Sequence, residues 1–468
     1  MVMPPLQHSH KGKKIRIAFF HELQFGGARR VVLEHIKELV RRGHDVDLYY
    51  TNEEKDKELE KIAHVAFHLP FFPKKWKGHD WKTRLYKDSL ELWKLSSHHQ
   101  HIAELINNKK YDIVVVHPSQ FTQAPFLLRF VTLPTLYYCQ EPLRLVYDEA
   151  VKGMQRQRGV RFLYEKGNEF IRKWIDSNNI HRATTIAVNS LFTKQNVFHA
   201  YGLSSQVVYL GVDTDFFHPI RGENIYDIGF IGAPEYIEGY DLLASLEHAH
   251  PNWKIHVTKR DHQGKGITDR ELVRLYNQCK VIVCLSRNEP FGLVPLEAAA
   301  CEIPVVAIEE GGYTETIQQG KTGYLVPRDC DTVEEKIAYL LDHSKEREQF
   351  GKNARVEMNK NWTWKQSTTA LEKLINKTVQ KEIKFSWKEW VHNGFVVYVS
   401  VVVVLLLIVR FSFRFLRTLF IAPSIIDGTV GYAQYFGYPF SFEAYLFGML
   451  FLIPVIVAIG LFLWSKRR

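Results

Sequence analysis

Residues 286–317, SRNEPFGLVPLEAAACEIPVVAIEEGGYTETI, carry the densest local pattern in the chain. Two acidic residues, Glu289 and Glu297, stand eight positions apart and enclose the pair Phe291-Gly292. The small residues around Glu297 predict a short helix, and the apolar run that follows predicts a buried strand. Loop, helix and strand in this order are the unit from which proteins with parallel sheets and helical crossovers are built.

The same alternation of strand and helix runs through most of the chain and starts again after residue 200. We therefore expect two α/β halves, a first domain at 14–200 and a second at 201–375, with ligands bound beyond the carboxyl ends of the strands. Expected strands lie at 14–20, 45–50, 111–116, 135–139, 228–231, 254–257, 281–285 and 305–308, with helices at 269–278 and 295–300. Residues 205–210 lead into Gly211-Val212-Asp213 at the start of the second half.

Composition places the chain among globular proteins. Its 468 residues leave room for two domains of ordinary size and a further segment. A formal net charge of +10 favours partners that carry phosphate, which include nucleic acid, anionic lipid and phosphorylated small molecules. The five cysteines contain no CxxC pair, which indicates reduced, buried thiols and a cytosolic compartment. The polar, basic N-terminus lacks the apolar core of a secretory signal peptide.

The C-terminal segment, residues 376–468, is apolar enough to predict a membrane anchor. Residues 445–464 form an uncharged run of 20 residues, which is long enough to cross a bilayer as a helix. A shorter uncharged run at 395–409 follows a stretch rich in lysine and tryptophan, as at a cytoplasmic membrane interface. Arginines after that run oppose a second span, so a re-entrant or interfacial segment stays open. We expect transmembrane helices at about 395–415 and 444–464, with the catalytic domains in the cytoplasm.

The segment 286–317 resembles the retaining, two-domain family-4 glycosyltransferases, whose mark is two glutamates in E-x7-E spacing around Phe-Gly. The similarity extends back to the Gly26-Gly27 turn and covers about residues 14–375. It implies the GT-B architecture, in which two Rossmann-like, doubly wound domains face a cleft. It also implies transfer of a hexose from a nucleotide sugar with retained anomeric configuration and without a metal ion or other cofactor. Consistently, we find no DxD-like acidic pair placed to hold a divalent ion.

The resemblance also implies roles for residues of the cleft. Glu297 is expected to accept both ribose hydroxyls, and Glu289 to contact the sugar. The helix start at Leu293-Val294 offers free N–H groups to the leaving diphosphate, and glycine pairs let backbone approach the ligand. The expected catalytic residues are Glu289, Gln140 and His117, and the expected donor-binding residues are Glu297, Gly26, Gly27, Phe291, Gly292, Leu293, Val294, Gly311, Gly312, Lys259 and Arg260.

These residues also have structural interpretations. Glu297 could be a solvated helix residue and Glu289 a helix cap. Both glycine pairs could be simple turns, and His117 could be a structural residue at the end of a strand.

Three positions depart from the family pattern. Gln140 stands where the family has a histidine that reaches the sugar, and glutamine can hydrogen-bond a hydroxyl but cannot carry a proton. Ala233 and Glu238 stand where the family has an arginine and a lysine that clamp the diphosphate, and one such interaction can contribute roughly 2.7–4 kcal/mol. We hypothesise that Lys259 or Arg260 supplies the missing charge; the alternative is a solvated basic turn.

The acceptor is expected to be a lipid-linked sugar or glycolipid, because a membrane anchor accompanies the stretch FFPKKWK at 71–77. Tryptophan interleaved with lysine suits a membrane interface or a phosphate-bearing lipid, and no nucleic-acid module is recognised. Three functions stay open: a retaining transferase that uses a UDP- or GDP-sugar, a binding protein with a degenerate site and no turnover, and a phosphorylase or epimerase. No pyridoxal-phosphate lysine site is apparent, and a dehydrogenase is excluded because G-x-G-x-x-G does not follow the first strand.

Overall fold

A computed structural model describes residues 14–73, 90–148, 151, 160–222, 224–258 and 267–381. The chain divides into two compact units, residues 1–383 and 384–468. The expected anchor helices at 395–415 and 444–464 lie outside the described residues, and so do Lys259 and Arg260. Within the ranges that are described, no helix has both the length and the apolar character to cross a membrane.

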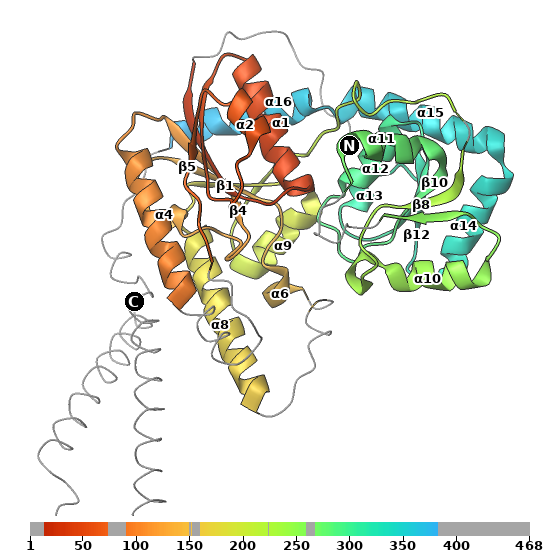
Figure 1. Ribbon diagram of the computed structural model, residues 1–468, viewed down its shortest axis with the longest axis horizontal. Helices are drawn as coiled ribbons and strands as arrows, with labels where there is room; N and C mark the ends of the chain where they lie inside the picture. The colour runs from red at the N-terminus through yellow and green to blue at the C-terminus, as the bar shows by residue number, and fades with distance from the viewer. Residues whose placement is uncertain are drawn as a thin grey trace, which may run out of the picture. The chain divides into compact units, whose positions relative to one another are not determined.

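The first half is built on a seven-stranded sheet in which all neighbouring strands are parallel (Figure 1). The central strands are buried along almost their whole length, because helices cover both faces. The strand order is β3-β2-β1-β4-β5-β6-β7, with β1 at Arg16–Glu22, β2 at Asp45–Tyr50, β3 at Val65–His68, β4 at Ile113–Ser119, β5 at Thr135–Cys139, β6 at Thr185–Val188 and β7 at Gln206–Val207.

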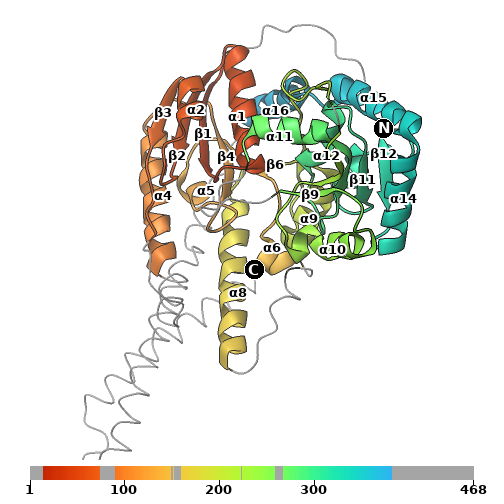
Figure 2. The ribbon, with the colours of Figure 1, turned by 45° about the vertical axis from the view of Figure 1, so that its right-hand side comes forward.

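Helices pack on the two faces of this sheet in separate layers (Figure 2). One face lies under α1 at Gly27–Arg41, whose apolar stripe points at the sheet, and under the last described helix, α16, at Trp364–Val379. The other face is covered by α4 at Leu92–Asn107, α5 at Leu127–Phe130 and α9 at Leu191–Tyr201. The other helices that the structure describes in this half are α2 at Lys57–Ile62, α6 at Arg144–Tyr147 and α8 at Val160–Ile180.

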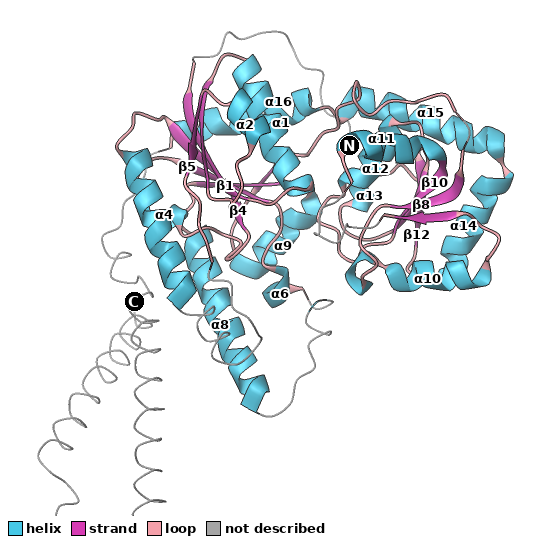
Figure 3. Cartoon of the chain, in the orientation of Figure 1, coloured by secondary structure: helices cyan, strands magenta, loops and turns pink. Residues whose placement is uncertain are grey.

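The second half repeats the design on a smaller scale, with five parallel strands between two helical layers (Figure 3). The strand order is β12-β11-β10-β8-β9, with β8 at Tyr226–Phe230, β9 at Ile255–Val257, β10 at Cys279–Cys284, β11 at Val305–Ile308 and β12 at Gly323–Val326. Its helices are η2 at Tyr236–Glu238, α10 at Tyr240–Ala249, α11 at Asp269–Gln278, α12 at Leu293–Ala300, α13 at Tyr313–Thr316, α14 at Cys330–Asp342 and α15 at Ser344–Asn361.

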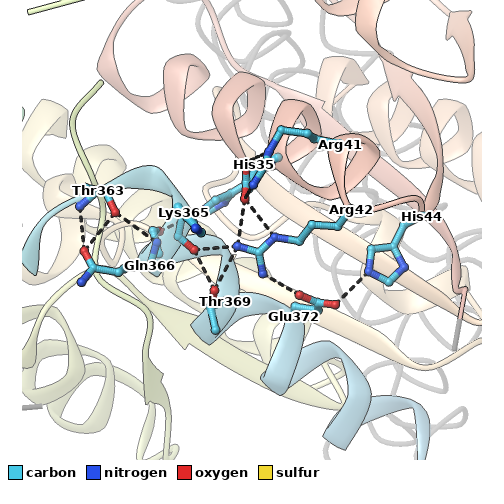
Figure 4. Close-up of polar contacts among 11 residues, drawn as sticks. His35, Arg41, Arg42, His44, Thr363, Lys365, Gln366, Thr369 and Glu372 are labelled. Carbon is cyan, nitrogen blue, oxygen red and sulfur yellow. Dashed lines mark hydrogen bonds and ion pairs between the residues drawn. The ribbon is translucent and has the colours of Figure 1, made fainter. Parts of the chain in front are cut away.

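The chain returns to the first half after α15. Thr363 and Gln366 form a capping box that starts α16, which then packs on α1. Glu372 of α16 accepts hydrogen bonds from Arg42 at 2.6 Å and pairs with His44 at 3.0 Å (Figure 4). Gly211 lies where the outgoing and returning segments cross, because a Cβ there would stand 2.4 Å from the Trp364 nitrogen. Two neighbouring segments of the chain, one around Gly211 and one around Trp364, thus connect the two halves.

Most expected elements are present with nearly the expected bounds, including β2, β5, β11 and α11. Residues 206–207, which were expected in the second half, form the two-residue strand β7, and this strand pairs with β6 of the first sheet. The expected division after residue 200 therefore falls before the last strand of the first half. The five cysteines are free, and only Cys330 is not fully buried.

Candidate active site

A pocket of about 360 Å³ opens in the second half, at the carboxyl ends of β8 and β10. Its size is that of a small-molecule site, and its position is where parallel sheets bind ligands. Four of the expected site residues line it: Glu289, Gly292, Leu293 and Val294. Also in its lining are Phe230, Ile231, Gly232, Ala233, Glu238, Thr258, Ile267, Leu272, Val283, Cys284, Leu285, Ser286 and Tyr313.

The loop that carries Glu289 is held in one shape by glycines. A Cβ on Gly312 would stand 2.4 Å from the Cα of Phe291, and one on Gly311 would stand 2.3 Å from the carbonyl oxygen of Glu289. The Gly312 amide donates to that same carbonyl oxygen at 2.8 Å. Gly311 and Gly312 therefore support the loop, which is a different task from the backbone approach to ligand that the sequence suggests. Phe291 is buried in the core and does not line the pocket.

The first turn of α12 closes one side of the pocket. It begins after Gly292, which has φ 84° and packs against the ring of Tyr313, with no room for a side chain. Leu293 and Val294, the first residues of α12, line the pocket with N–H groups that precede the first helical hydrogen bonds. A helix start in a pocket wall can accept an anion.

The side chains around the pocket carry negative charge. Glu238 lines it and accepts a hydrogen bond from Ser286 Oγ at 2.7 Å. Burial, together with the carboxylates of Glu238 and Glu141 and against the opposing charge of Arg144, raises the pKa of Glu289 to about 7. Among the lining residues that the structure describes there is no lysine or arginine. No group of three or more potential metal ligands occurs in the described part of the chain.

Glu297, on α12, is not among the lining residues, and its side chain is only 4% exposed. One carboxylate oxygen is bonded to Arg30 of α1, and the other accepts from the Tyr276 hydroxyl at 2.7 Å. Burial raises the pKa of Glu297, and the charge of Arg30 opposes that rise. A buried carboxylate with two donors is not the solvated helix residue that the sequence left open. Neither Arg30 nor Tyr276 is marked by a sequence pattern that pairs it with Glu297.

The glycine turn of the first half lies close to α12. A Cβ on Gly27 would come within 3.3 Å of Leu293 Cδ1, whereas Gly26, with φ 150°, has open space. Gln140, just after β5, donates from Nε2 to the Ala28 carbonyl at 3.1 Å. The turn, Gln140 and the start of α12 are thus brought together from distant parts of the sequence.

His117 does not join this group. Its ring is fully buried in β4, stacked 5.3 Å from Tyr138 and 5.9 Å from Phe19. Burial lowers its pKa well below the ordinary value, so the ring is neutral. The geometry favours a packing role for His117 over the expected contact with acceptor or sugar.

Comparison with known proteins agrees with this geometry. Residues 25–216 match the model described as Glycosyltransferase Family 4, and residues 259–357 match the one described as Glycosyl transferases group 1. The chain is a glycosyltransferase with group 1 and family 4-like domains.

Among curated relatives of this glycosyltransferase is the alpha-1,3/1,6-mannosyltransferase ALG2 of Rhizomucor pusillus, 22% identical over 78% of this chain and 92% of the relative. The GT-B fold is shared with the sucrose-phosphate synthase of Thermosynechococcus elongatus, with a TM-score of 0.60, 16% identity, and coverage of 78% of this chain and 99% of that one. Anabaena HepE, solved with UDP and glucose, matches with a TM-score of 0.56, 16% identity, and coverage of 77% and 99%.

Proposed function

We propose that this glycosyltransferase moves a hexose from a UDP- or GDP-sugar to a membrane-bound, lipid-linked acceptor, with retention of anomeric configuration and without a metal ion. The observation that carries the proposal is the pocket at the carboxyl ends of β8 and β10, where Glu289 meets the start of α12. The solved relative HepE holds UDP and glucose, which makes UDP a reasonable first probe. The mannosyltransferase relative makes mannose the first sugar to test.

Each part of the donor has a proposed partner. The diphosphate lies at the first turn of α12, where the N–H groups of Leu293 and Val294 stabilise the charge that develops as the bond to the sugar breaks. Glu289 faces the sugar, and Glu297 takes the ribose hydroxyls. Gln140 and the Gly26-Gly27 turn approach from the first half. Because Glu289 has a pKa of about 7, near neutral pH it can donate a hydrogen bond as well as accept one.

The acceptor and the membrane anchor are proposed from sequence. The uncharged runs at 395–409 and 445–464 would hold the catalytic halves at a bilayer, where a lipid-linked acceptor is concentrated. Lys259 or Arg260 stays our candidate for the missing positive charge. Turnover that is intact in both Lys259→Ala and Arg260→Ala would contradict that part of the proposal.

Binding without turnover is the second candidate, and one observation favours it. Glu238 lines the pocket where the resemblance places a lysine, so a carboxylate faces the expected diphosphate. Such a charge weakens binding of the donor and of a charged leaving group.

Calorimetric titration of UDP and GDP into the full-length protein in detergent tests the proposal. We expect one nucleotide to bind, and Glu297→Ala to abolish binding, while Glu348→Ala, at an exposed position of α15, binds normally. The sugars of the nucleotide that binds are then assayed for transfer. Absence of binding to folded wild-type protein would contradict the donor site, and binding without transfer of any sugar would favour the second candidate.

A further inference from the structure

The Glu297 carboxylate is held from two directions. Tyr276 on α11 donates its hydroxyl hydrogen to one oxygen at 2.7 Å. Arg30 on α1 bonds the other oxygen, and its guanidinium also pairs with Asp269 at the start of α11. Arg30 and Tyr276 thus fix both ends of the carboxylate, and only Arg30 comes from the first half.

Arg30 is placed to do this by its own half. It is in the first turn of α1, and its amide donates to the Gly26 carbonyl at 3.1 Å, so the glycine turn sets its position. Its side chain is 18% exposed and passes over the ring of Phe217, 5.6 Å from the centroid. The neighbouring Arg29 points away and pairs with Asp56 and Glu58 of the first half.

The number of hydrogen bonds that a carboxylate can accept indicates whether Glu297 can also bind a ligand. An ionised carboxylate has about four lone-pair sites on its two oxygens. Arg30 and Tyr276 use one site on each oxygen. Among the residues that the structure describes no other group bonds this carboxylate, so one site on each oxygen is left, and two vicinal ribose hydroxyls can donate to such a pair.

We propose that Arg30 is a positioning residue of the donor site, which orients the Glu297 carboxylate for the ribose from the opposite half of the molecule. The inference rests on the proposed function, because it takes Glu297 as the partner of the ribose. It follows that the ribose site is complete only when α1 lies against α12. The positive charge of Arg30 also opposes the rise that burial causes in the pKa of Glu297, which favours the ionised form that accepts hydroxyl hydrogens.

The test compares a nucleotide with its 2′-deoxy form, because a residue that acts through Glu297 changes how strongly the protein prefers ribose. Calorimetry with UDP and 2′-deoxy-UDP, and with GDP and 2′-deoxy-GDP, is carried out on the full-length chain. The variants are Arg30→Gln, Arg30→Lys and Arg42→Gln. The last is the matched control, since Arg42 caps the C-terminal end of α1 and pairs with Glu372 of α16, away from Glu297.

For Arg30→Gln we expect binding of the ribonucleotide to weaken about tenfold, as for the loss of one hydrogen bond to a charged group. Binding of the deoxynucleotide should change less, so that the ribose preference falls towards one. Arg30→Lys should restore part of the preference, and Arg42→Gln should keep the wild-type preference. Thermal unfolding shows whether each variant is folded. If Arg30→Gln is not folded, the preference for ribonucleotide over deoxynucleotide is measured in Arg30→Lys instead.

Two results would overturn the inference while leaving the proposed function standing. Equal weakening of both nucleotides in Arg30→Gln would mean a merely structural role. Tighter binding in that variant would mean that Arg30 competes with the ribose for Glu297. If wild-type protein binds neither nucleotide, the proposed function fails and takes this inference with it.

Discussion

At Gly312 a single methyl group would collide with the chain that carries Glu289. A Cβ there would lie 2.4 Å from the Phe291 Cα and 2.8 Å from the Pro290 carbonyl oxygen. We expect Gly312→Ala to lower the free energy of unfolding by about 1–3 kcal/mol, as for other overpacked sites, and to weaken nucleotide binding because the loop moves. Urea unfolding and calorimetry measure the two effects. Gly222→Ala, which has open space, is the control and should change neither.

The titration of Glu289 gives a prediction about pH. Burial, with help from Glu238 and Glu141, raises its pKa from 4.5 to about 7. Between these values the folded chain holds a proton that the unfolded chain has released, so the free energy of unfolding falls as pH rises. Glu289→Gln removes this loss, and at pH 8 the variant should be more stable than wild type by about 3 kcal/mol, with a smaller difference at pH 5.

Urea unfolding at both pH values checks this prediction, with the exposed Glu54→Gln as control. A gap between Glu289→Gln and wild type that is the same at pH 5 and pH 8 would mean that Glu289 does not titrate in this range.

At candidate site residues that a local motif marks, the sequence predicted which residues line the pocket. Glu289, Gly292, Leu293 and Val294 were expected from one continuous segment, and they do line the pocket. Arg30 could not be found this way, because it lies 267 positions from Glu297 in sequence and meets it only through the packing of the two halves. His117 shows the opposite limit: a strand-end position alone does not tell whether the side chain faces a cleft or the core.

At the scale of elements, α16 is the helix that returns the chain to the first half, and Glu372 is its main polar contact with the end of α1 (Figure 4). Burial alone would raise the pKa of Glu372, but its hydrogen bonds to Arg42 and His44 outweigh burial and lower it. The stabilisation is therefore present above the unfolded pKa of about 4.5 and is lost as pH falls through the lower, folded value.

Glu372→Gln should lower the free energy of unfolding by about 1 kcal/mol at pH 7, the upper range for a partly exposed ion pair. The exposed Glu348→Gln on α15 should have no effect. Chemical unfolding at pH 7 and pH 4 checks both statements, and a loss that persists unchanged at pH 4 would contradict the ionic explanation.

Elements with strong periodicity were predictable, and short or edge elements were not. β5 and α11 have the expected bounds, because a buried strand and a capped amphipathic helix are local patterns. β7 was not predicted as a strand, since two residues at the edge of a sheet carry too little pattern to name their partner strand. β3, with an exposed Val65, lacks the buried run that identifies the central strands.

At the scale of the whole molecule, the charge of the chain and the charge of its pocket have opposite signs. A net charge of +10 attracts phosphate-bearing ligands over long range. The pocket is lined by Glu238 and Glu289. At short range their negative charge repels the phosphate groups that the net charge of the chain attracts. In the described part of the chain, the first turn of α12 favours binding of an anion in this pocket.

Replacing Glu238 tests which of these effects dominates. Glu238→Gln keeps an acceptor for Ser286 Oγ and removes one negative charge from the pocket wall. We expect it to tighten binding of UDP or GDP about tenfold at low salt, the effect of roughly 1.4 kcal/mol, and by less at 0.5 M salt because added ions screen the charge. Glu235→Gln, an exposed neighbour, should leave affinity unchanged. Weaker binding by Glu238→Gln would instead show that the carboxylate contacts the ligand, and would make Glu238 a donor-binding residue in place of the cation that the family pattern has there.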